Sequence, residues 1–188
     1  LMVELRHILK NVGLTSLYVT HDQEEAFALA DRVLIMQDGR IVQRGTPEEV
    51  YRRPATPFVA QFLGLTNLIP GTVAATEPLC VDTSFGRLQV SPDGAGPSVQ
   101  AGDRVMVLAR PEAAMLLSPG SYADNLIVGT LTDRSFRGGH YWIGVQPADG
   151  PELNFQLGPD VNVPEVSATI RLALRRNALT LLPEWETD

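Results

Sequence analysis

Apolar residues in the first third of the chain follow a helical period and then a strand period. The first ten residues place their apolar side chains on one face, at spacings of three and four: Leu1, Leu5, Ile8 and Leu9. Arg6 and Lys10 fall on other faces, so this segment predicts an amphipathic helix, which Gly13 should end. Because the period is already running at Leu1, we expect the sequence to open inside an element.

A strand and a second helix are predicted next. Residues 15–20 (TSLYVT) are rich in β-formers, which predicts a short buried strand. Thr20 and Gln23 match a capping box, and acidic residues follow them, as is typical of a helix N-terminus. This helix should run to about Ala30.

Residues 32–36 (RVLIM) and 40–44 (RIVQR) predict a hairpin, since the Asp38-Gly39 pair between them is a strong turn sequence. A helix should begin at Thr46-Pro47-Glu48-Glu49, which supplies a cap, a proline in the first position and acids in the first turn. Thr56-Pro57 should begin another helix.

After Gly64 the pattern changes, because short β-rich runs alternate with glycine, proline and aspartate. The runs lie at residues 68–74, 79–81, 87–90, 104–109, 126–132, 141–145, 153–157, 169–174 and 179–182. Their spacing predicts a small all-β barrel or sandwich, with a domain boundary near residues 64–67.

The β-rich part contains an internal repeat. Residues 67–72 (NLIPGT) are similar to residues 125–130 (NLIVGT), and residues 104–117 are similar to residues 169–182. Two related β-units packed together would explain both similarities. Chance similarity between apolar strands is the alternative.

Charge and cysteine content narrow the function classes. The net charge is −7, and residues 65–188 carry −6 of it, so the second half would repel a nucleic-acid backbone. Cys80 is the single cysteine, which excludes an intramolecular disulfide and fits a reducing compartment. The longest apolar runs, such as residues 105–109, are far too short to cross a bilayer, so a partner would have to hold the protein at a membrane.

Residues 19–64 carry a family resemblance. They contain Thr20-His21-Asp22, Asp38-Gly39-Arg40 and Gly45-Thr46-Pro47. This run resembles the C-terminal third of the nucleotide-binding domain of ABC transporters. More narrowly, it is similar to the importer ATPases for ferric iron, polyamines, sulfate and maltose. The resemblance implies that residues 1–64 are an α/β part of that domain.

The β-rich part resembles the accessory domain of the same subunits, known as the TOBE domain. Arg110-Pro111-Glu112 and Phe136-Arg137-Gly138 carry this second similarity. It implies that residues 65–188 form an OB-like small barrel with a regulatory or dimerisation role. These motifs also favour, weakly, the ferric-iron and polyamine branches of the family.

His21 is the single candidate catalytic residue. It follows the end of a predicted strand, where open α/β sheets place their ligand crevice. By resemblance it is the switch histidine, which hydrogen-bonds the γ-phosphate of ATP and orients the attacking water or the catalytic carboxylate. A histidine in this position outside the family would more often serve as a cap or as a core residue.

Other parts of the ATPase machinery are absent from the 188 residues. No GxxxxGK[ST] occurs, and Lys10 is the sole lysine. The signature loop is absent, as is the strand that ends in the magnesium-site aspartate and the catalytic glutamate. We therefore expect no tight binding or hydrolysis of ATP by this chain alone, no cofactor contact beyond His21 and no resident metal site.

For the complete subunit, the resemblance implies ATP and Mg²⁺ as cofactors and a second copy of the subunit in a homodimer. Membrane-spanning permease subunits would be the other partners, and the subunit would lie peripherally at the cytoplasmic face of the inner membrane. Two further functions stay open for residues 65–188: binding of a small oxyanion or another ligand, or dimerisation alone.

The remaining polar candidates have structural explanations. Asp22, Glu24 and Glu25 are potential metal ligands, but a helix N-terminus accounts for them, as it does for Glu48 and Glu49. The other candidates could touch a partner or a ligand, but surface or packing roles are simpler explanations: His7, Arg52, Arg53, Cys80, Arg134, Arg137 and His140.

Overall fold

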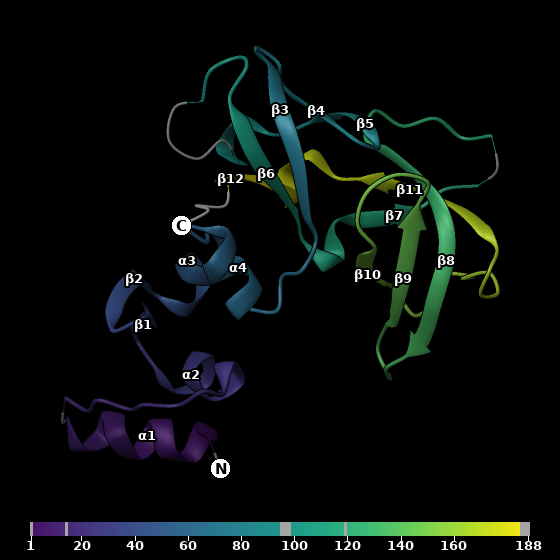
Figure 1. Ribbon diagram of the computed structural model, residues 1–188. Helices are drawn as coiled ribbons and strands as arrows, with labels where there is room; N and C mark the ends of the chain where they lie inside the picture. Colours follow the sequence, from purple (N-terminus) through teal and green to yellow (C-terminus); the bar gives the residue numbers. More distant parts are fainter. Residues whose placement is uncertain (1, 14, 95–98, 119, 185–188) are drawn as a thin grey trace. The chain divides into compact units, whose positions relative to one another are not determined.

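The computed structural model describes residues 2–13, 15–94, 99–118 and 120–184, and the chain divides into two compact units (Figure 1). Unit 1 is Leu1–Leu63 and unit 2 is Gly64–Asp188. Within the described residues, no helix is long and apolar enough to cross a membrane.

Unit 1 holds four short helices and one hairpin. The elements are α1 (Met2–Val12), α2 (Gln23–Leu29), β1 (Val33–Gln37), β2 (Arg40–Gly45), α3 (Pro47–Arg52) and α4 (Pro57–Phe62). Local signals in the sequence set most of these limits. Gly13 follows α1 with a φ of 67°, and Asp38 and Gly39 both take positive φ in the β1–β2 turn. Thr46 and Glu49 form a complete capping box at the start of α3.

The predicted strand at residues 15–20 is wrong. These residues belong to no strand of the described structure, and Leu17 and Val19 are 86% and 87% exposed. A buried strand needs hydrogen-bonding neighbours along its edges. Within the described part of unit 1, the sheet consists of β1 and β2 paired with each other, and so residues 15–20 lie beside no strand that could accept them.

The capping prediction at Thr20 is also wrong by two positions. Asp22 is the N-cap of α2, and its side chain accepts hydrogen bonds from the backbone N–H groups of Glu24 and Glu25. The Thr20 hydroxyl oxygen instead accepts a hydrogen bond from the Asp22 N–H at 3.0 Å. An ionised aspartate competes well for this place because it adds a favourable interaction with the helix dipole.

Unit 2 consists of two five-stranded sheets, in the orders β5-β4-β3-β6-β12 and β10-β9-β8-β11-β7. The strands are β3 (Leu68–Thr76), β4 (Leu79–Thr83), β5 (Gly86–Gln89), β6 (Arg104–Ala109), β7 (Ala114–Leu116), β8 (Leu126–Phe136), β9 (Tyr141–Pro147), β10 (Leu153–Leu157), β11 (Thr169–Leu174) and β12 (Leu179–Pro183). Short 3₁₀ turns lie at Pro92–Gly94, Pro111–Ala113 and Arg176–Ala178. All nine predicted β-runs are confirmed, and the three-residue β7 is the addition.

The internal repeat is a structural repeat in which the two halves exchange their last strands. β3 to β6 form four strands of one sheet, and β8 to β11 form the equivalent four of the other. β7, at the end of the first half, pairs with β11, while β12, at the end of the second half, pairs with β6. Each sheet is therefore completed by the other half of the unit.

The paired asparagines of the repeat have equivalent roles. The buried Asn67 side chain accepts a hydrogen bond from the N–H of Asn154 and donates one to its carbonyl oxygen, both at 2.6 Å. In the same way, the Asn125 side chain accepts a hydrogen bond from the N–H of Gln89 at 2.7 Å and donates one to its carbonyl oxygen at 2.8 Å. Each asparagine thus fastens one half of unit 2 to an outer strand of the other half.

The glycines of the repeat allow close strand approach. A Cβ placed on Gly71 would lie 2.9 Å from the carbonyl oxygen of Asp82, and one on Gly129 would lie 2.8 Å from that of Gln146. One apolar core occupies the space between the two sheets, with contributions from both halves. Its large, fully buried members include Phe155, Ile69 and Leu131.

Candidate functional site

His21 lies directly before α2, and it is exposed. The next residue, Asp22, caps the helix through its Oδ1 atom, which accepts hydrogen bonds from the N–H groups of Glu24 and Glu25 at 2.8 and 3.1 Å. His21 therefore lies one residue before the N-cap of α2. The strand that the sequence predicted directly before His21 is not formed, and residues 15–20 belong to no helix or strand.

Glu25 ties that extended segment to the first turn of α2. Its Oε2 atom accepts a hydrogen bond from the Thr20 hydroxyl at 2.9 Å and another from the Tyr18 hydroxyl at 3.1 Å. The hydrogen bond to the carboxylate raises the pKa of Tyr18, because ionised phenol would lose that bond and face a like charge. Residues on both sides of His21 are thus fastened to α2.

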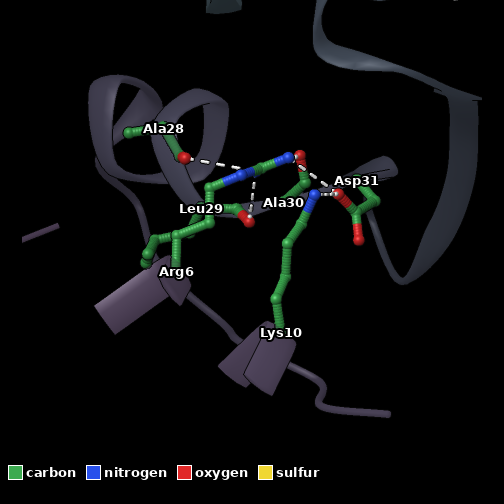
Figure 2. Close-up of polar contacts among 6 residues, drawn as sticks. All are labelled: Arg6, Lys10, Ala28, Leu29, Ala30 and Asp31. Atoms are coloured by element: carbon green, nitrogen blue, oxygen red, sulfur yellow. Dashed lines mark hydrogen bonds and ion pairs between the residues drawn. The ribbon is translucent and has the colours of Figure 1, made fainter. Parts of the chain in front are cut away.

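The far end of α2 is held by a residue that the sequence patterns did not single out. Figure 2 shows the Arg6 side chain reaching from α1 to the last turn of α2. Its Nη1 atom donates to the carbonyl oxygens of Leu29 at 2.7 Å and of Ala28 and Ala30 at 3.2 Å. Its Nη2 atom donates to Asp31 Oδ1 at 2.8 Å.

The acidic residues near His21 serve the helix. Asp22 is its N-cap, and Glu25 accepts hydrogen bonds from the preceding segment. Among the residues that the structure describes, no three His, Cys, Asp or Glu side chains form a group that could hold a metal ion.

The other charged candidates of unit 1 have structural roles or lie exposed. Glu48 pairs with Arg52 at 3.0 Å, one helical turn away. The Glu49 carboxylate accepts a hydrogen bond from the backbone N–H of Thr46 at 2.8 Å, and the Thr46 hydroxyl oxygen accepts one from the backbone N–H of Glu49 at 3.2 Å. Hydrogen bonds with the backbone and the side chain of Thr46 lower the pKa of Glu49. His7 and Arg53 are exposed.

The candidates of unit 2 cluster on the β8–β9 hairpin. Arg134 pairs with Glu165 at 2.8 Å and lies 5.5 Å from the ring centre of Tyr141, and these interactions raise its pKa. Arg137 lies 5.1 Å from the ring centre of Trp142. The hairpin is thus a packed cluster of arginine and aromatic side chains, beside which His140 is half-buried, while Cys80 is a buried free thiol.

Comparison with known proteins bears on both units. No family model matches the chain. A "Fe(3+) ions import ATP-binding protein FbpC" of Streptomyces coelicolor is 43% identical over 170 residues, which are 90% of this chain and 45% of that protein. A "Spermidine/putrescine import ATP-binding protein PotA" of Trichormus variabilis is 41% identical over 157 residues, which are 82% of this chain and 41% of that protein. The chain spans less than half the length of these relatives.

Among solved structures, the cytoplasmic molybdate-binding protein ModG, with molybdate bound, superposes with a TM-score of 0.52 at 14% identity. The superposition covers 62% of this chain and 94% of ModG, and at this identity it establishes the fold alone. It agrees with a small OB-like β-barrel of the TOBE type. Over most of its length, therefore, this chain is a homologue of the ATP-binding subunits of ABC importers, with an α/β segment followed by an OB-like β-unit.

Proposed function

We propose that these 188 residues act as the C-terminal portion of the ATP-hydrolysing subunit of an ABC importer, with His21 as the residue that senses the γ-phosphate of ATP. One observation carries the proposal. The exposed His21 precedes the N-cap of α2, hydrogen bonds to Asp22 and Glu25 hold the chain on both sides of it, and the segment matches import ATP-binding proteins. Residues 1–64 would form part of the nucleotide-binding domain and residues 65–188 the accessory domain.

His21 suits a role at the transferring phosphoryl group. Phosphoryl transfer depends on positioning and on stabilisation of charge at the γ-phosphate. An imidazole can donate a hydrogen bond to a phosphate oxygen through one nitrogen and orient a water or a carboxylate through the other. Fixed segments before and after His21 limit the positions that this side chain can take.

The chain alone would not hydrolyse ATP. Within its sequence there is no GxxxxGK[ST] loop to hold the phosphates. Of the carboxylates beside His21, Asp22 caps α2 and Glu25 accepts hydrogen bonds from Tyr18 and Thr20. ATP and Mg²⁺ would bind where the remainder of an ATP-binding subunit supplies those groups. Partners of such a subunit would be a second copy of itself and the permease subunits, at the cytoplasmic face of the membrane.

A chimera tests the proposal. This chain would replace the matching segment of the Streptomyces coelicolor protein, and ATP hydrolysis would be measured with His21→Ala and, as a control, His7→Ala, which removes another exposed histidine. We expect His21→Ala to lower kcat by roughly 10²-fold or more and to leave KM for ATP little changed, since the imidazole acts on the transition state. Unchanged turnover would refute the assigned role.

Within the family we place the chain with importers of ferric iron or polyamines. Arg110-Pro111-Glu112 and Phe136-Arg137-Gly138 support this branch, as do the names of the relatives above. Chimeras of this chain with the ferric-iron protein of Streptomyces coelicolor and with the polyamine protein of Trichormus variabilis, each with its own permease, would test the branch. Transport supported by one chimera and not by the other would favour that substrate.

Binding of a small oxyanion by unit 2 is the second candidate function. A cleft of about 780 Å³ is lined by Arg175 and Arg176, although Arg176 is paired with Asp124 and Arg175 donates to the carbonyl oxygen of Glu112. Titration calorimetry of the chain with molybdate, sulfate and phosphate tests it. Absence of heat with all three would remove this candidate and leave dimerisation as the role of unit 2.

A further inference from the structure

The Arg6 guanidinium makes an unusual set of contacts for a residue near the start of a chain. It donates to three consecutive backbone carbonyl oxygens at the end of α2, those of Ala28, Leu29 and Ala30, and to the carboxylate of Asp31. These partners lie 22 to 25 residues later in the sequence. The side chain is 31% exposed, so the contacts are only partly open to water.

The contacts supply hydrogen-bond donors and a positive charge that α2 lacks at its C-terminal end. The last carbonyl groups of a helix have no partners within the helix, and a cation there is favourable. The last turn of α2 contains no basic residue, and its C-cap is Ala30 in an extended conformation. A helix of seven residues is unstable in isolation, so a group that satisfies its final carbonyls has a large influence on whether it forms.

The same helix fixes His21. Asp22 caps its first turn, and Glu25 in that turn holds Tyr18 and Thr20 on the other side of the histidine. If α2 unfolds, the Asp22 cap and the hydrogen bonds from Tyr18 and Thr20 to Glu25 lose their geometry together. We propose that Arg6 is a positioning residue for His21, which acts by holding the C-terminal end of α2. This inference rests on the role proposed for His21.

Lys10 provides a matched control on the same helix. It lies one turn after Arg6 and contacts Asp31 Oδ1 at 3.5 Å, while the backbone carbonyls are contacted by Arg6 (Figure 2). Lys10→Ala removes a cation from the same cluster and leaves the carbonyl contacts of Arg6 in place. If the positive charge near Asp31 stabilises α2, both variants should destabilise the helix. If the contacts with the carbonyl oxygens stabilise it, Arg6→Ala alone should do so.

The first experiment uses the 188-residue chain and needs no activity. Amide hydrogen exchange of Ala26 and Ala30, which donate to Asp22 and Ala26 in α2, would be followed by NMR in the wild type, Arg6→Ala, Arg6→Lys and Lys10→Ala. We expect protection to fall about tenfold in Arg6→Ala, to fall less in Arg6→Lys and to stay unchanged in Lys10→Ala. Equal protection in all four proteins would overturn the inference. If Arg6→Ala does not fold, the comparison of Arg6→Lys with Lys10→Ala decides in the same way.

The second experiment uses the chimera and a double-variant cycle. Arg6→Ala should lower kcat by about tenfold or more and leave KM for ATP little changed. Arg6→Lys should lose less activity than Arg6→Ala. In a protein that already carries His21→Ala, adding Arg6→Ala should lower kcat no further. Additive losses would mean that Arg6 acts independently of His21, which overturns the inference. Loss in His21→Ala together with normal turnover in Arg6→Ala would also overturn it and leave the proposed function standing. Unchanged turnover in His21→Ala would instead remove the proposed function itself.

Discussion

The two units differ in how far they bury their large apolar side chains. Unit 2 buries a continuous core between two complete sheets, to which each half of its repeat contributes. Unit 1 buries few large side chains and exposes many, among them Ile8, Val12, Leu17, Val19, Leu34, Met36 and Ile41. Unit 2 therefore has an apolar core of its own, while several large apolar side chains in the described part of unit 1 lie exposed to solvent.

The largest expected effect is on the free energy of unfolding, for which a substitution in the core of unit 2 is compared with one in the exposed segment of unit 1. Phe155 is fully buried, and Phe155→Ala should lower the free energy of unfolding by about 3–5 kcal/mol. Leu17→Ala changes a side chain that is 86% exposed, so its effect should stay within about 0.5 kcal/mol. Urea unfolding followed by circular dichroism measures both, and equal losses would contradict the contrast between the units.

A medium effect is expected at the two asparagines of unit 2. Asn67→Ala and Asn125→Ala each leave a backbone N–H and a carbonyl oxygen without their partner, which should cost about 1–3 kcal/mol. Because the two sites are equivalent in the repeat, the two losses should be similar. The exposed Asn162→Ala serves as the control in the same unfolding measurement, and a large effect on only one of the pair would show that the halves are not energetically equivalent.

The smallest effect concerns the cap of α3 in unit 1. Thr46→Ala removes the capping box and should cost about 1 kcal/mol. Hydrogen bonds from Thr46 lower the pKa of Glu49, so the stabilisation from its carboxylate is present above the ordinary glutamate pKa and is lost as pH falls through the lowered value. NMR titration should show a partial rise of the Glu49 pKa in Thr46→Ala, because the side-chain hydrogen bond is lost while the backbone N–H of residue 46, the larger cause of the lowered pKa, remains. A Glu49 pKa that does not move would mean that the Thr46 side chain does not contribute to lowering it.

The sequence predicted most elements because their signals are local. Turn residues such as Asp38-Gly39, the Thr46 capping box and the β-runs of unit 2 act within a few positions. Residues 15–20 were misassigned because a run of β-formers shows a preference for burial and not whether neighbouring strands are present. The role of Arg6 escaped prediction for a related reason. Its partners are backbone carbonyls more than twenty residues away, and no side-chain pattern marks them.

The exchange of β7 and β12 also constrains the order in which unit 2 can be completed during synthesis. β7 leaves the ribosome well before β11, the strand on which it pairs, and β6 waits for β12 near the end of the chain. At about 5–20 residues per second, several seconds separate a strand from its partner. Synthesis must therefore pass β11 before β7 can pair and pass β12 before β6 gains its second neighbour. A ribosome that stalls before those points would leave the nascent chain with open strand edges for chaperones or proteases to recognise.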